Sequence, residues 1–182
     1  MNLFNSFSRH AAFIACLSTV VVLSGCASPI THSALVPAAP AIVTQHVKSV
    51  AVVAAGGAET SAAGKSSVSD AELQLAVATA IKQSKVFSQV VEGKNGDYVL
   101  NVNISNLDQP NFGFSFTVTV EMGWTLTRAD TGAVVWRESI KSGHTVSAGE
   151  AFAGVERLRL ATEGAIRKNI EQGLGKLSAL SL

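Results

Sequence analysis

The sequence has 182 residues, of which 47% are hydrophobic and 15% are charged, with 14 Lys and Arg against 13 Asp and Glu. The hydrophobic fraction excludes a wholly disordered chain, and the near-neutral charge balance excludes the cationic surface by which proteins bind nucleic acid. No apolar run reaches the roughly 20 residues that a membrane-spanning helix requires.

The first 25 residues have the pattern of a secretory signal peptide. Residues 1–10 carry one cation, Arg9, and no acid, and residues 11–23 form a short apolar core. A cationic start followed by such a core is typical of a secretion signal and is too short to span a bilayer. Small residues then precede Cys26, in the order Leu23-Ser24-Gly25-Cys26-Ala27.

This order resembles the lipobox of bacterial lipoproteins. The resemblance implies cleavage between Gly25 and Cys26 and acylation of Cys26, with palmitate among the expected chains, so that the protein is attached to a membrane. Three acyl chains would anchor it firmly, since one chain binds only marginally. In such lipoproteins an Asp after the cysteine retains the protein in the inner membrane. Here that residue is Ala27, so the resemblance implies the outer membrane and its periplasmic face.

Residues 26–45 predict an acylated cysteine followed by an extended tether. The segment holds three of the four prolines, Pro29, Pro37 and Pro40, and no charged residue. Each proline disfavours helix at the residue before it. His32 and His46 are interpreted as solvated residues at or near this tether rather than as metal ligands.

Residues 46–182 predict a single folded domain. The Val-rich run 47–55 predicts a buried strand, and the capping-box spacing from Ser69 to Glu72 predicts the start of a helix. Residues 86–92 predict a second, short strand.

Apolar residues alternate with mostly polar ones in 98–105, and they alternate strictly with small or polar residues in 112–127. Alternation of this length predicts strands with one buried and one polar face. A turn at 130–132 predicts a hairpin into a strand at 134–145. The capping-box match from Ser147 to Glu150 predicts a long helix that runs to about residue 177.

The predicted order is therefore β-α-β-β-β-β-α. A mainly antiparallel sheet with one apolar face and two amphipathic helices packs as an α+β two-layer sandwich, with both helices on one face. The last helix is expected to carry Phe152 on its apolar stripe. Gly154 and Gly164 in this helix indicate either a close approach to the sheet or a kink.

Three aromatic residues are the candidate binding residues of the domain: Phe112, Phe114 and Phe116. One interpretation is that their rings form core beneath the helices. The alternative is an opening near Pro110, where these rings contact an acyl chain or an apolar segment of a partner. The Thr-rich opposite face, residues 115–127, is either solvated or a protein-docking surface.

The sequence lacks the complete motifs that nucleotide binding and nucleophilic catalysis require. Gly64-Lys65-Ser66 lacks the first glycine of a phosphate-binding loop, since Glu59 stands there. His144 and Glu150 are candidates for an acid–base pair, but no recognisable nucleophile accompanies them. The other carboxylates considered are Asp108, Asp130 and Glu156. We expect no enzyme activity, nucleotide, metal or cofactor.

With these elements placed, the domain resembles small lipoproteins of Gram-negative envelopes, in the YajG and curli-secretion-channel-like group. The resemblance rests on the lipobox, on the Val-rich first strand and on residues 97–100, 131–136 and 147–150. It implies a fold and an outer-membrane location. We expect a non-catalytic accessory or adaptor subunit in envelope assembly or transport, with an envelope protein as partner. The alternative is a lipid-handling module that binds an acyl chain between the Phe-rich strand and the C-terminal helix.

Overall fold

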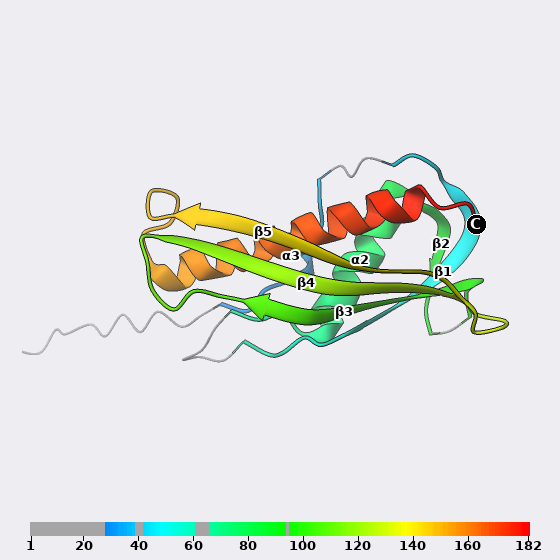
Figure 1. The fold of residues 1–182 in the computed structure, drawn as a ribbon, viewed down its shortest axis with the longest axis horizontal. Coiled ribbons are helices and arrows are strands. Elements are labelled where there is room, and N and C mark those ends of the chain that lie inside the picture. Colours follow the sequence, from blue (N-terminus) through cyan, green and yellow to red (C-terminus); the bar gives the residue numbers. More distant parts are fainter. Residues whose placement is uncertain (1–27, 39–41, 61–65, 94) are drawn as a thin grey trace, which may run out of the picture.

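The computed structural model describes residues 28–38, 42–60, 66–93 and 95–182 (Figure 1). Within these ranges the chain forms three helices and one five-stranded sheet in the strand order β2-β1-β3-β4-β5. The elements are α1 (His32–Leu35), β1 (His46–Ala55), α2 (Asp70–Ser84), β2 (Phe87–Val91), β3 (Tyr98–Asp108), β4 (Ser115–Arg128), β5 (Val134–Ser147) and α3 (Gly154–Ser178).

The helices α2 and α3 cover one face of the sheet (Figure 1). The long strands β3, β4 and β5 pair antiparallel, while β1 pairs parallel with both β2 and β3. The parallel β1–β2 pair follows from the crossover through α2, since a strand that returns beside its predecessor by way of a helix runs in the same direction. The α+β two-layer sandwich and its element order are confirmed, with α1 as an additional turn of helix.

Strand β4 supplies the central row of the core. Its inward-facing residues are at most 6% exposed: Phe116, Val118, Val120, Met122, Trp124 and Leu126. Period-2 alternation is therefore confirmed over these positions. The strand nevertheless begins at Ser115, later than predicted, because Gly113 has a φ of 146°. Residues with a side chain rarely adopt that conformation. It interrupts the extended backbone at Gly113, so Phe112 and Phe114 lie outside the strand.

Helix α3 also begins later than predicted. The carboxylate of Glu150 accepts hydrogen bonds from the backbone N (2.9 Å) and the Oγ (2.8 Å) of Ser147, which closes a turn after β5. The helix starts four residues beyond Glu150, after Ala153, whose side chain caps nothing. The prediction that Ser147 and Glu150 open the helix is wrong, and Phe152 lies outside its apolar stripe.

Two glycines of α3 allow the helix to approach the sheet closely. A Cβ on Gly164 would overlap the ring of His144, and a Cβ on Gly173 would lie 2.5 Å from Cζ2 of Trp124. Gly154, by contrast, has only ordinary contacts at the helix start. Of the two alternatives for Gly164, close approach is the correct one, because α3 continues through it.

A buried polar network fixes α3 on the sheet. The indole Nε1 of Trp124 donates to Oδ1 of Asn169 at 3.0 Å, and Nδ2 of Asn169 donates to the carbonyl of Ile140 at 2.7 Å. Ser142 Oγ donates to the carbonyl of Ala165 at 2.8 Å. Satisfied networks of this kind specify one register of helix on strand, because any shift leaves buried groups unpaired.

The segment predicted to be a solvated tether is partly folded. Ile30 and Leu35 are 2% and 0% exposed, and α1 packs against α2 and α3. The tether prediction is wrong for residues 30–35, because the apolar side chains of Ile30 and Leu35 belong to the core. Arg167 of α3 fixes the segment further, since its Nε donates to the carbonyl of Ala34 at 2.9 Å.

Both histidines predicted to be solvated make contacts within the domain. His32 Nδ1 lies 3.0 Å from Glu72 Oε2, and the His32 backbone N donates to the same oxygen. Ser69 caps α2 as predicted, with its Oγ accepting from the Glu72 backbone N at 3.3 Å, but the Glu72 carboxylate is used by His32. His46 is buried, and its Nε2 lies 2.9 Å from the carbonyl oxygen of Leu177.

Candidate functional site

Exposed aromatic side chains gather on two loops at one end of the domain. Phe112 and Phe114, on the β3–β4 loop, are 88% and 89% exposed, and Phe152, on the β5–α3 loop, is 95% exposed. Val155, in the first turn of α3, is 45% exposed. Both loops lie at the end where β4 and α3 begin (Figure 1). We call these four residues the apolar tip.

Arg157 holds the two loops of the apolar tip together. Its Nη1 donates to the carbonyls of Ala151 (3.0 Å) and Phe152 (2.5 Å), and its Nη2 donates to the carbonyl of Gly113 (3.3 Å). The guanidinium lies 5.0 Å from the centre of the Phe116 ring and is itself buried. Hydrogen bonds from a charged donor are stronger than neutral ones. The apolar tip is therefore a braced structure that directs aromatic rings outward.

The three predicted binding residues are separated by the structure. Phe116 is buried beneath Arg157 and the first turn of α3, whereas Phe112 and Phe114 face outward. The core interpretation describes Phe116 only. Phe116 and Arg157 thus occupy the space between strand and helix in which the alternative interpretation placed an acyl chain.

Sequence reasoning missed the contribution of Phe152 and Arg157 to this end of the domain. Phe152 was assigned to the helix stripe because the Ser147–Glu150 spacing mimics a helix start. The signal that could have corrected this is Gly154, a residue disfavoured inside helices, which is in fact the first residue of α3.

Two of the candidate acid–base residues, Glu150 and Glu156, accept hydrogen bonds from nearby residues. Hydrogen bonds from the Ser147 backbone and side chain lower the pKa of Glu150, and a hydrogen bond from Arg159 lowers the pKa of Glu156. Both carboxyls are thus held ionised, which does not suit a general acid. His144 is exposed on β5 beside Gly164. Among the described residues, no three His, Cys, Asp or Glu side chains are grouped to hold a metal ion.

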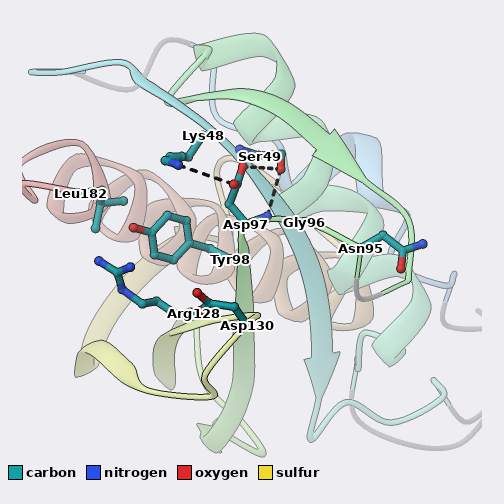
Figure 2. Close-up of a pocket in the computed structure, with 9 residues that line it drawn as sticks. All are labelled: Lys48, Ser49, Asn95, Gly96, Asp97, Tyr98, Arg128, Asp130 and Leu182. Carbon is teal, nitrogen blue, oxygen red and sulfur yellow. Dashed lines mark hydrogen bonds and ion pairs between the residues drawn. The ribbon is translucent and has the colours of Figure 1, made fainter.

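A polar cleft of about 490 Å³ lies at the opposite end of the sheet (Figure 2). Asp97 Oδ2 accepts from the backbone N and the Oγ of Ser49, both at 2.8 Å, and Lys48 Nζ lies 3.6 Å from Asp97 Oδ1. The hydrogen bonds from Ser49 are the main cause of a lowered pKa of Asp97. Arg128 and Asp130 line the same cleft. The hydrogen bonds from Ser49 to Asp97 join the β2–β3 turn to β1. We call the contact between Asp97 and Ser49 the Asp97 clip and assign it a structural role.

The Thr-rich face of β4 lies on the side of the sheet away from the helices. Its side chains pair across strands: Thr117 Oγ1 and Thr145 Oγ1 lie 2.8 Å apart, and Ser139 Oγ donates to Glu121 Oε1 at 2.6 Å. The face is polar and partly exposed, as expected from the alternation.

Several predicted features lie outside the described residues, among them Gly25, Cys26, Gly64 and Lys65. Ser66 is described and buried, and its carbonyl accepts from Gln109 Nε2 at 2.6 Å. In the part of the chain that the structure describes, no helix is both long and apolar enough to cross a membrane.

Solved structures share this fold at low sequence identity. A Xanthomonas campestris protein of the DUF330 family superposes with a TM-score of 0.60 and 16% identity over 78% of this chain and 90% of its own. A candidate lipoprotein from Caulobacter crescentus superposes with a TM-score of 0.50 and 17% identity, over 71% of this chain and 87% of its own. PelC from Paraburkholderia phytofirmans, a dodecamer, superposes with a TM-score of 0.50 and 17% identity, over 78% of this chain and 96% of its own. No protein-family model and no curated protein sequence matches the chain. The fold is thus shared with a candidate lipoprotein.

Proposed function

We propose that this chain is a lipid-anchored protein at the periplasmic face of the outer membrane, and a non-catalytic accessory or adaptor subunit of an envelope assembly or transport system. The main support for a lipid anchor is the position of Cys26 in the Leu23–Ala27 sequence, directly after a signal-like apolar core. The fold shared with the Caulobacter crescentus candidate lipoprotein supports it.

An adaptor role is supported by the exposed edge of the sheet, which could bind another protein. Strand β5 forms one edge of the sheet over Val134–Ser147, so its outer backbone groups lack a strand partner within the described chain. Such an edge can accept another strand. Glu150 and Glu156, considered for catalysis, are engaged in local hydrogen bonds instead. PelC, similar in fold, is a dodecamer, which supports a role as a subunit of an assembly.

The anchor is tested by Cys26→Ser in the full-length chain. We expect uncleaved precursor without acyl chains, seen by mass spectrometry of the intact protein. Cys16→Ser is the matched control, because Cys16 lies inside the apolar core of the signal and would be removed with it. Normal maturation of Cys26→Ser would overturn the anchor.

The adaptor role is tested by in-cell photo-crosslinking of the full-length protein. A crosslinking residue at Lys141, exposed on β5, should capture one stoichiometric envelope protein or further copies of this chain. The same residue at Gln83, exposed on α2, is the control position. Recovery of an unassociated monomer from both positions would overturn the adaptor role.

The same purification addresses lipid handling. Phe116 and Arg157 occupy the acyl-chain position of the alternative hypothesis, so we expect the protein to carry no lipid beyond its own anchor. A stoichiometric additional lipid in the mass spectrum would favour the lipid-handling alternative.

A further inference from the structure

The apolar tip lies at the end of the domain where the N-terminal segment enters. Ile30 is buried and lines one cleft together with Ser67. The carbonyl of the adjacent Ser66 accepts a hydrogen bond from Gln109, which follows β3 directly. Gln109 in turn precedes Phe112 by three residues. A short chain of contacts therefore joins the N-terminal entry to the apolar tip.

The chain between the proposed lipid anchor and the folded domain is short. Cys26 precedes the buried Ile30 by four residues, which span at most about 14 Å when fully extended. The packing of Ile30 and Leu35 thus removes the long spacer that the prolines suggested. An acylated Cys26 would hold this end of the domain at the membrane surface.

We propose that the apolar tip inserts into the membrane leaflet that holds the lipid anchor, as a second contact between the domain and the bilayer. The proposal rests on the proposed acylation of Cys26. Aromatic and aliphatic side chains on a surface facing the bilayer gain free energy by leaving water for the boundary between headgroups and acyl chains. The Arg157 bracing leaves little conformational entropy to lose when the loops insert, so the exposed rings are ready to bind.

The charges beside the apolar tip indicate which lipids it contacts. Asp108 and Glu150 flank its two loops and are both acids, while the charge of Arg157 is buried against Phe116. Anionic headgroups would be repelled by these carboxylates, since like charges at a membrane surface oppose binding. The occupant is therefore a zwitterionic phospholipid surface, contacted through the rings.

Insertion can be measured with a tryptophan at each end of the domain. Phe114→Trp and Phe152→Trp place a fluorophore in the apolar tip at sites exposed enough to leave the core unchanged. Thr131→Trp, in the exposed β4–β5 turn, is the matched control at the opposite end. Each full-length variant is extracted from membranes and reconstituted into phosphatidylethanolamine and phosphatidylcholine vesicles, with or without bromine on the acyl chains. The emission of Trp124 and Trp136 is common to all variants and is subtracted.

We expect the tip tryptophans to shift to shorter wavelength and to lose emission in brominated vesicles, while Thr131→Trp does neither. Mass spectrometry of Cys26 in the same samples separates the two proposals. An acylated Cys26 with unquenched tip tryptophans overturns the insertion and leaves the anchor intact. A quenched tip on an unacylated chain overturns the anchor, and with it the proposal that the tip is a second contact beside that anchor. A photo-crosslinking residue at position 114 tests for a protein partner instead. If it captures a protein or a second copy of this chain, and the tip tryptophans are not quenched, the insertion is also overturned.

Discussion

The indole ring of Trp124 lies directly against Gly173, where any larger residue would collide with it. A Cβ at position 173 would lie 2.5 Å from Cζ2 and 2.6 Å from Cη2 of the ring. The ring cannot move aside, because it is fully buried and its Nε1 is hydrogen-bonded to Asn169 on the same helix. Gly173→Ala should therefore destabilise the domain by about 1–3 kcal/mol. Urea unfolding measures this loss.

The direction of that change is informative because helix propensity predicts the reverse. Alanine is favoured over glycine inside a helix by about 1 kcal/mol. Gly154→Ala is the matched control in the same helix, since its Cβ would meet Arg157 Nη2 at 3.7 Å, an ordinary contact. It should leave stability unchanged or raise it slightly. A Gly173→Ala variant as stable as Gly154→Ala would contradict the close packing described.

Arg157 should be needed for the order of the apolar tip as well as for stability. Arg157→Ala removes the donors to the carbonyls of Ala151, Phe152 and Gly113. Loss of hydrogen bonds from a charged group costs about 1.5–3 kcal/mol. Amide hydrogen exchange should rise in residues 111–114 and 149–153 and change little in β3. Arg137→Ala, on an exposed site of β5, is the control. Unchanged exchange in both loops would show that Arg157 does not brace them.

Local sequence patterns predicted the layers of the fold because they report which face of an element is buried. The alternation from Phe116 to Leu126 marks the inward row of β4, and Ser69 marks the start of α2. These signals arise within a few residues of one another. They carry no information on which strands are neighbours, so the parallel pairing of β1 with β3 was not predictable.

The candidate site was less predictable because it depends on contacts between distant residues. Phe112 and Phe114 continue the alternation of Phe116, and only the backbone at Gly113 turns them outward. The Ser147–Glu150 spacing satisfies a turn as well as a helix start, so local chemistry could not decide between them. Arg157 acquires its role by reaching a carbonyl 44 residues away.

Leu35 provides a direct test of whether the N-terminal segment is part of the domain. Its side chain is fully buried, so Leu35→Ala should cost about 2–5 kcal/mol of stability through lost contacts and a residual cavity. Val43→Ala, at a position 77% exposed, should change stability by less than about 0.5 kcal/mol. Equal unfolding midpoints for the two variants would show that the segment behaves as a solvated tether. That result would also mean that a long flexible spacer separates Cys26 from the folded domain.

The Asp97 clip should make stability depend on pH in the acidic range. Its pKa is lowered in the folded domain by hydrogen bonds from Ser49, so the folded state binds fewer protons there than the unfolded chain. The stabilisation is complete above the unfolded pKa of about 3.9 and is lost as the pH falls through the lower folded value. Asp97→Asn should thus lower Tm at pH 7, with a difference from the wild type that shrinks below about pH 4. Ser49→Ala, which keeps the carboxylate and the backbone donor but removes the Oγ donor, should give a smaller difference over the same range. Parallel Tm profiles for wild type and Asp97→Asn from pH 7 to the acid limit would contradict the assignment.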